Sequence, residues 1–198
     1  MVDLAPEDAA SAAGLARALL DGGVTILQLR MKGAEGRSML QAALVLRALC
    51  DEARATFIVN DRLDVALAAG ADGVHLGQDD LPLGDARALS PPGFLIGVST
   101  HDEAQARAAA EAGADYLGFG PVFATSTKER PDPVVGLERL AAVCRGVRVP
   151  VVAIGGITLE QIAAVAATGA RAAAVIRAVN SAPDVVAAAR AVAAAFHR

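Results

Sequence analysis

The stretch Ala-Gly-Ala-Asp-Gly-Val at residues 69–74 returns as Ala-Gly-Ala-Asp-Tyr at 112–116 and as Thr-Gly-Ala-Arg-Ala at 168–172. A shorter form, Asp-Gly-Gly-Val, stands at 21–24. A glycine that follows an Ala-rich segment caps the end of a helix, because it readily adopts the left-handed backbone conformation found there. The small residues beside it let the chain turn tightly into an apolar run. The repeat therefore predicts helices that each lead into a strand, and its role is structural.

Working outward from these repeats, we find seven apolar runs that fit strands: Val24–Arg30, Thr56–Asn60, Gly73–Leu76, Phe94–Val98, Tyr116–Phe119, Val149–Ile154 and Ala172–Ile176. Helix-forming segments lie between them, among them Asp102–Ala112, Leu159–Ala167 and Asp184–Phe196. Strand–helix units that repeat without any other kind of segment predict an α/β fold, a (β/α)8 TIM barrel.

The predicted barrel is one strand short. A helical segment, Pro6–Leu20, opens the chain, so the first strand is absent or reduced to residues 2–4. We expect a truncated start. A missing strand would leave unpaired strand edges, which another segment or subunit has to cover. This favours a homodimer.

Composition limits the function. The 198 residues fit a single domain, 1–198, with 54% hydrophobic and 3% aromatic residues. A net charge of −4 argues against a general nucleic-acid-binding face. No apolar run approaches the ~18 residues of a membrane span, and no signal peptide is evident. Cys50 and Cys144 lie too far apart for a zinc motif. We expect a soluble cytoplasmic protein without a membrane or nucleic-acid partner.

In such barrels, functional residues gather where the strands end. The first apolar run ends with Gln28, Arg30 and Lys32, which alternation places on one face. Asp61 and Asp80 follow the next two strands. Cations beside carboxylates suit a metal diphosphate, because Mg²⁺ prefers oxygen ligands. A solvated strand end that forms salt bridges explains the first trio about as well.

Each carboxylate also has a local explanation. Asp61 could form an Asx turn or a helix N-cap. Of the adjacent Asp79 and Asp80, one could cap a helix while the other binds metal. For Ser99 and Thr100, capping the next helix is a better explanation than anion binding. Without a Ser or Cys nucleophile as partner, a loop histidine is the better interpretation of the nearby His101 than a general base.

A long loop follows Phe119. It carries Thr125, Ser126, Thr127 and Lys128, which suit anion binding and exclusion of water, although a merely flexible loop is an alternative. Gly155–Gly156 stands before a helix, and the last strand runs to Ile176 and Arg177. Barrels often bind phosphate between these last two loops, while a tight turn explains the glycine pair nearly as well.

The chain resembles the thiamine-phosphate synthase family over nearly its whole length. The segments that carry the resemblance are QLRMK (28–32), IVND (58–61), VHLGQDD (74–80), GVSTH (97–101), GFGPVFATSTK (118–128), VAIGGIT (152–158) and AVIRAV (174–179). Any one of them is weak, but together at successive strand ends they are specific. The resemblance implies a transferase that joins hydroxymethylpyrimidine diphosphate to hydroxyethylthiazole phosphate with Mg²⁺ and releases diphosphate.

The resemblance also implies roles for residues. The pyrimidine diphosphate would contact Gln28, Arg30, Lys32, Asn60, Ser99 and Lys128, with Leu29 and Met31 in the same segment. Arg30, Lys32 and Lys128 would stabilise the leaving diphosphate, and Asp61 and Asp80 would bind Mg²⁺. The thiazole phosphate would contact Thr125, Ser126, Thr127, Gly155, Gly156, Ile176 and Arg177.

One departure affects this site. The family usually has Ser where Arg177 stands, so Arg177 either adds a contact to phosphate or fills the pocket.

Two other functions compete with that of the synthase. A thiazole tautomerase of the same fold uses a His where this chain has Pro121. The other rival is a non-catalytic regulator that binds thiamine phosphate, suggested by Arg177 and the missing strand. Pro121, with Lys32, Asp61, Asp80 and Lys128, favours the synthase.

Overall fold

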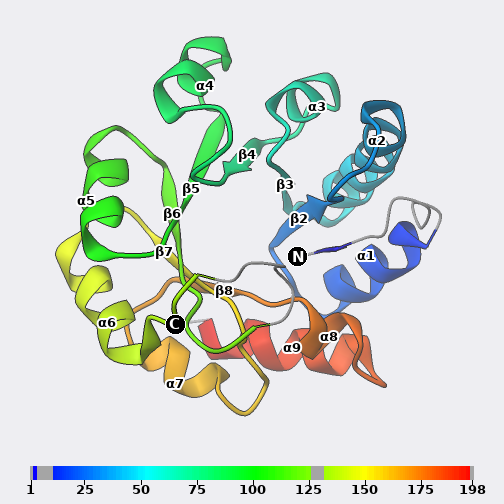
Figure 1. The fold of residues 1–198 in the computed structure, drawn as a ribbon. Helices are drawn as coiled ribbons and strands as arrows, with labels where there is room; N and C mark the ends of the chain where they lie inside the picture. Colours follow the sequence, from blue (N-terminus) through cyan, green and yellow to red (C-terminus); the bar gives the residue numbers. More distant parts are fainter. Residues whose placement is uncertain (1, 4–10, 126–131, 197–198) are drawn as a thin grey trace.

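The computed structural model describes residues 2–3, 11–125 and 132–196. Eight parallel strands pair in chain order, from β1 to β8, and the helices surround them (Figure 1). The strands are β1 (Val2–Asp3), β2 (Ile26–Arg30), β3 (Thr56–Asn60), β4 (Gly73–Leu76), β5 (Leu95–Thr100), β6 (Tyr116–Phe119), β7 (Val151–Ile154) and β8 (Ala172–Ala174). This arrangement confirms the predicted (β/α)8 barrel.

The helices follow the strands along the chain. They are α1 (Ala12–Asp21), α2 (Gly36–Ala53), α3 (Leu63–Ala68), α4 (Leu83–Leu89), α5 (Glu103–Glu111), α6 (Gly136–Gly146), α7 (Ile162–Ala167), α8 (Arg177–Asn180) and α9 (Val185–Phe196). Within the described residues, no helix is both long and apolar enough to cross a membrane.

The structure revises both ends of the predicted barrel. The first strand is present as a two-residue strand, in which Val2 pairs with Leu29 and Asp3 with Arg30. Of the two alternatives, an absent first strand or one reduced to residues 2–4, the structure shows the reduced strand. The last strand ends at Ala174 rather than Ile176, because α8 already begins at Arg177. The first residues of the predicted helix, 6–10, lie outside the described residues.

The repeated glycines lie at helix ends, as predicted. Each one stands one position after the C-cap residue, however, and is not the C-cap itself. Ala69, Ala112 and Thr168 are the C-cap residues of their helices. Gly70, Gly113 and Gly169 follow with φ angles of 62°, 92° and 95°. These left-handed residues turn the chain back toward the next strand, which confirms a structural role for the repeat.

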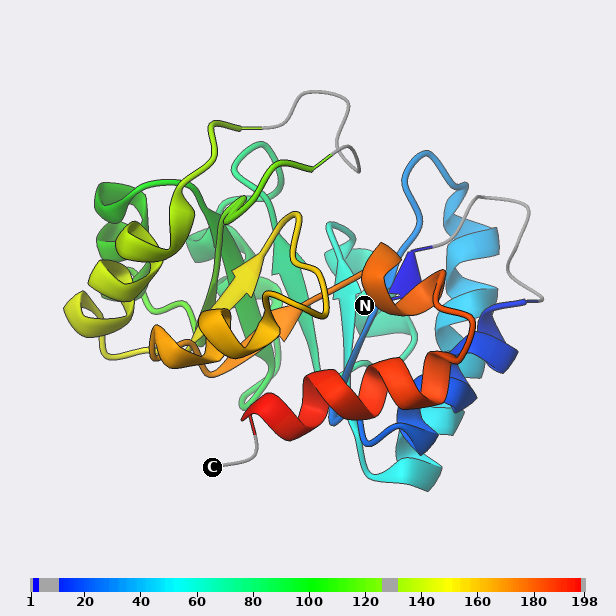
Figure 2. The same ribbon diagram turned by 90° about the horizontal axis from the view of Figure 1, so that it is seen from below.

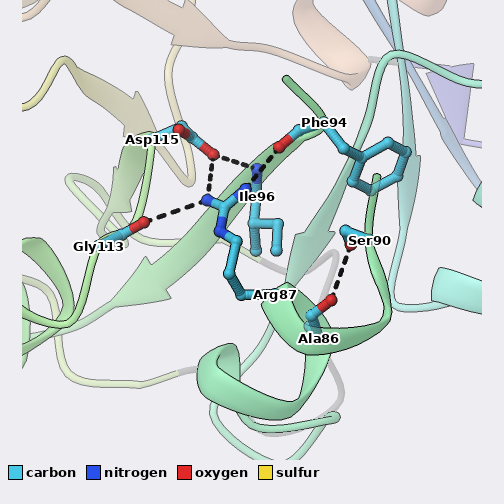
Figure 3. A network of polar contacts seen from close by, with 7 residues as sticks. All are labelled: Ala86, Arg87, Ser90, Phe94, Ile96, Gly113 and Asp115. Carbon is cyan, nitrogen blue, oxygen red and sulfur yellow. Dashed lines mark hydrogen bonds and ion pairs between the residues drawn. The ribbon is translucent and has the colours of Figure 1, made fainter. Parts of the chain in front are cut away.

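The aspartates of the repeat join neighbouring strands. The Asp115 carboxylate accepts from the backbone N–H of Ile96 at 2.7 Å and from the Arg87 guanidinium at 2.5 Å (Figure 3). Arg87 also donates to the carbonyls of Phe94 and Gly113. Asp72 has the same role in the repeat at 69–74, where its carboxylate accepts from the Phe57 N–H at 2.7 Å and from the Arg47 guanidinium at 2.7 Å.

This network predicts a local stability effect. Arg87→Ala leaves Asp115 and two carbonyls without their donor, so we expect a loss of about 1–3 kcal/mol in the free energy of unfolding. Arg107→Ala on the neighbouring α5 is the matched control, with an expected change within about 0.5 kcal/mol. Urea unfolding followed by circular dichroism measures both. Equal losses in the two variants would show that the network adds no stability.

Candidate active site

The end of β2 presents polar side chains to the open end of the barrel. Leu27 and Leu29 are fully buried in the core, whereas Gln28 and Arg30 are partly exposed and the Lys32 side chain is 60% exposed. This alternation agrees with the predicted common face for Gln28, Arg30 and Lys32. The side chains of Leu29 and Met31 lie in the hydrophobic core, so only their backbone could contact a substrate.

Asp61 lies directly after β3, beside Lys32. Its backbone is left-handed, with φ 65°, and its N–H donates to the His75 carbonyl at 2.8 Å. The carboxylate accepts a hydrogen bond from the Lys32 ammonium group. Arg62 is the N-cap residue of α3, and that cap has no side-chain hydrogen bond. The Asp61 side chain therefore faces the β2 cation instead of capping a helix.

Asp80 brings a second carboxylate to the same place. Its Oδ2 atom accepts from Gly77 N–H at 2.7 Å, and the carboxyl also interacts with that of Asp61. Burial raises the pKa of Asp80, as does the nearby charge of Asp61, against the opposing Gly77 hydrogen bond. Pro82 is the N-cap residue of α4, so neither Asp79 nor Asp80 caps this helix.

The donor set at this point fits Mg²⁺. Because the charge of Asp61 raises the pKa of Asp80, a cation bound between the two carboxylates would relieve their repulsion. Mg²⁺ commonly takes one or two carboxylates and completes its shell with water and phosphate oxygens. The described residues contain no group of three or more His, Cys, Asp or Glu side chains that could hold a metal without such help. The geometry therefore suits a metal that arrives with a phosphorylated substrate.

A network of polar side chains links β2, β4, β5 and β6. His75 Nε2 lies 2.9 Å from the Ser99 hydroxyl, and His75 Nδ1 lies 3.1 Å from the Tyr116 hydroxyl. Burial lowers the pKa of His75 to about 4, so the ring is neutral at neutral pH. Gln28 interacts with the Tyr116 hydroxyl, while its buried Oε1 atom has no hydrogen-bond partner among the described residues.

Sequence reasoning missed Tyr116 and Gln78 as parts of this site. Gln78 donates to the backbone carbonyl of Ser99, which ties the β4–α4 loop to β5. Tyr116 pairs in register with Gly97, where a Cβ atom would lie 2.1 Å from the tyrosine ring. The available signal was a glycine within one strand and a tyrosine that opens the next.

The other polar residues predicted to lie near Gln28 are at the ends of β3 and β5. Asn60 closes β3 and is 8% exposed. Ser99 is partly exposed, whereas Thr100 is buried and donates to the Gly118 carbonyl at 3.1 Å. Asp102 caps α5 by accepting from Gln105 N–H at 2.8 Å. Ser99 is therefore not needed for capping, contrary to our interpretation of the sequence.

The first part of the long loop lies against the glycine pair after β7. Val122 N–H donates to the Ile154 carbonyl at 2.8 Å, and Phe123 N–H to the Gly155 carbonyl at 3.1 Å. A Cβ atom on Gly156 would lie 2.4 Å from the Ala124 carbonyl oxygen. This contact brings Thr125 toward the glycine turn. Ser126, Thr127 and Lys128 lie outside the described residues.

Ile176 and Arg177 stand at the start of α8, after the last strand. Ile176 is the N-cap residue and is partly exposed. Arg177 is exposed, so its side chain does not fill a packed pocket. Figure 2 shows the segments directly after β2 and β6, up to residue 125 in the second case, leaving the same end of the barrel. The structure thus gathers the described predicted residues at the carboxyl ends of the strands.

Comparison with known proteins identifies relatives of this chain. The family model described as thiamine monophosphate synthase matches residues 3–179. The thiamine-phosphate synthase of Methanoculleus marisnigri is 53% identical over 176 residues, which cover 89% of this chain and 83% of the relative. That of Anaeromyxobacter dehalogenans is 51% identical over 181 residues, 91% of this chain and 81% of the relative.

A solved structure agrees with these relatives. The thiamine phosphate pyrophosphorylase from Pyrococcus furiosus superposes with a TM-score of 0.89 at 39% identity, over 98% of this chain and 93% of that chain. The family model covers the barrel from β1 into α8, including every strand end described above. This chain belongs to the thiamine monophosphate synthase family.

Proposed function

We propose that this chain is a thiamine-phosphate synthase that joins hydroxymethylpyrimidine diphosphate to hydroxyethylthiazole phosphate and releases diphosphate. One observation carries the proposal: the Lys32 cation and the carboxylates of Asp61 and Asp80 meet at the ends of three successive strands. This is the charge pattern that binds a metal diphosphate. The relatives that bear the name thiamine-phosphate synthase support the same activity.

The pyrimidine diphosphate binds over β2 to β5. Gln28 offers its unpartnered amide oxygen to an amino group of the pyrimidine ring. Asn60 on β3 and Ser99 on β5 flank the ring from either side of β4, and the neutral His75 holds the Ser99 hydroxyl in place. Lys32, Arg30 and Lys128 bind the diphosphate oxygens. Leu29 and Met31 support the strand from the core.

The carboxylates of Asp61 and Asp80 hold the metal. Mg²⁺, when bound, neutralises the charge that develops on the departing diphosphate. Lys32 already contacts Asp61, so the Asp61 carboxylate would interact with both the ammonium group and the metal. Because the leaving group carries the developing charge, the site supplies preorganised positive charge and needs no strong base.

The thiazole phosphate binds between the last two strand ends. The backbone amides of Gly155 and Gly156 and the hydroxyls of Thr125, Ser126 and Thr127 donate to the phosphate, together with the segment at Ile176 and Arg177. The Arg177 side chain is exposed and does not fill a packed pocket. Its guanidinium therefore adds a charge-assisted contact to this phosphate. The carbon–oxygen bond to diphosphate breaks, and the thiazole nitrogen forms the new bond to that carbon. This nitrogen carries no hydrogen, so no proton leaves.

Product formation tests the proposal directly. The purified chain is incubated with both substrates, with Mg²⁺ or with EDTA, and thiamine phosphate is detected by chromatography. We expect product only with Mg²⁺. Binding of thiamine phosphate without turnover would support the regulator, and isomerisation of the thiazole precursor would support the tautomerase. A cytoplasmic location and a homodimer remain predictions of the sequence.

The paired carboxylates predict an effect of metal on stability. Asp80→Asn removes one charge yet keeps an acceptor for Gly77, so the metal-free variant should melt about 2–4 °C higher than the wild type. Mg²⁺ with pyrophosphate should raise the melting temperature of the wild type only. Because the pKa of Asp80 is raised, the metal-free wild type gains stability as the pH falls, and this gain is lost in the variant. Thermal scans at several pH values measure these effects, and an identical metal response in both proteins would contradict the assignment.

A further inference from the structure

His101 lies between the two ends of the segment that connects β6 to α6. It follows β5, and its side chain is 14% exposed. Its Nδ1 atom lies 2.5 Å from the Gly120 carbonyl oxygen, where the connection begins. Its Nε2 atom lies 3.4 Å from an Asp132 carboxylate oxygen, where the connection returns toward α6. One side chain thus contacts both ends of a long connection.

The backbone closes the connection at the same level. Val135 N–H donates to the Pro121 carbonyl at 2.8 Å, so the entering and leaving chains are joined just beyond Gly120. His101 is fixed in turn, because its own N–H donates to the Gln105 side chain at 2.9 Å. Gln105 is a part of α5, which Asp102 caps. The backbone of His101 is therefore anchored to a helix that does not belong to the connection.

The connection beyond Gly120 reaches the glycine turn after β7. Val122 and Phe123 hydrogen-bond to Ile154 and Gly155, and the Ala124 carbonyl lies against Gly156. A displacement at Gly120 would pass through these contacts to the turn. Of the residues in the pyrimidine half of the site, Gln28, Asp61 and Asp80 lie on or after β2, β3 and β4, whereas Ser99 lies on β5 and Lys128 belongs to the connection.

We propose that His101 is a positioning residue for the half of the site that binds the thiazole phosphate. This inference rests on the proposed function. The ring donates through Nδ1 to the Gly120 carbonyl and places Nε2 against the Asp132 carboxylate. It holds residues 121–125 against Gly155 and Gly156 without touching a substrate.

Two near-isosteric variants separate the two contacts. Asparagine places its amide near the position of Nδ1, so His101→Asn keeps the hydrogen bond to Gly120. Glutamine reaches the position of Nε2, so His101→Gln keeps only the contact with Asp132. We expect His101→Gln to raise the KM for the thiazole phosphate roughly tenfold, the loss of about one hydrogen bond. The KM for the pyrimidine diphosphate should rise less than that for the thiazole phosphate, because most of its proposed contacts lie on or after β2 to β4, and His101→Asn should restore most of the loss.

Amide hydrogen exchange provides a readout that does not depend on turnover. In His101→Gln, the N–H groups of Val122, Phe123 and Val135 should exchange roughly tenfold faster than in the wild type, while those of β2 and β3 stay protected. Unchanged exchange at Val122 and Phe123, or an equal rise in both KM values, overturns the proposal. If the wild type forms no thiamine phosphate, the proposed function fails, and the exchange result still decides whether His101 holds this segment.

Discussion

Asp61→Asn lowers the rate of Mg²⁺-dependent thiamine phosphate formation by at least roughly a thousandfold, because a metal supplies several kcal/mol of transition-state stabilisation. Asparagine keeps the size of the side chain and its oxygen. It removes the charge that faces Lys32 and that acts beside Asp80. The measurement is the initial rate of product formation over a titration with Mg²⁺.

The backbone at this position decides which substitution is informative. Asp61 has φ 65°, a conformation that asparagine tolerates and that strains alanine by about 1–2 kcal/mol. Asp61→Ala would therefore combine a loss of metal binding with a loss of stability. Asp64→Asn is the matched control, because Asp64 lies on the neighbouring α3 and pairs with Arg62 at the surface. A rate within about threefold of the wild type for Asp61→Asn would remove the metal assignment.

The residues at the strand ends could be predicted from local sequence patterns, because side-chain alternation and the parallel order of the strands both apply there. Alternation along β2 separates buried Leu29 from partly exposed Gln28 and Arg30. The parallel order of the strands then brings the ends of β2, β3 and β4 to one edge. These rules place Lys32 near Asp61 without any knowledge of side-chain conformation. They cannot choose between helix capping and metal binding for Asp61, since that depends on a left-handed backbone angle.

Features that depend on contacts between distant segments were not predictable in this way. The two-residue strand β1 is defined by its pairing with Leu29 and Arg30, not by any pattern of its own. The end of β8 depends on where α8 begins. The polar chain from Gln28 through Tyr116 and His75 to Ser99 joins four strands. The sequence alone does not show which of these side chains become hydrogen-bond partners.

The glycine pair after β7 shows the same difference in a single motif. A tight turn and a phosphate site both explain Gly155–Gly156 in the sequence. The structure adds that Gly155 has φ 87° and Gly156 has φ 68°, and that the loop after β6 lies against both. Gly156 therefore combines a backbone conformation that favours glycine with a close approach of another segment. Its replacement tests both properties at once.

Gly156→Ala places a methyl group 2.4 Å from the Ala124 carbonyl oxygen and 2.6 Å from the Phe123 carbonyl oxygen. Both are backbone atoms, so the loop must move away from the turn. We expect kcat/KM for the thiazole phosphate to fall roughly a hundredfold, because a displacement of about 1 Å at a reacting site has an effect of this size. Affinity for the pyrimidine diphosphate, measured by calorimetry, should stay within about threefold of the wild type, because Lys128 alone among its proposed contacts belongs to the loop that moves.

Gly113→Ala is the matched control for this experiment. Gly113 has φ 92°, but a Cβ atom there would meet nothing within 4 Å. It carries the backbone strain, about 1–2 kcal/mol, without the collision. We therefore expect Gly113→Ala to melt at a lower temperature than the wild type and to keep its kcat/KM. In Gly156→Ala, both the melting temperature and kcat/KM should fall. If the two variants lose activity equally, backbone strain explains the effect, and the contact between the β6–α6 loop and the glycine turn plays no part in binding the thiazole phosphate.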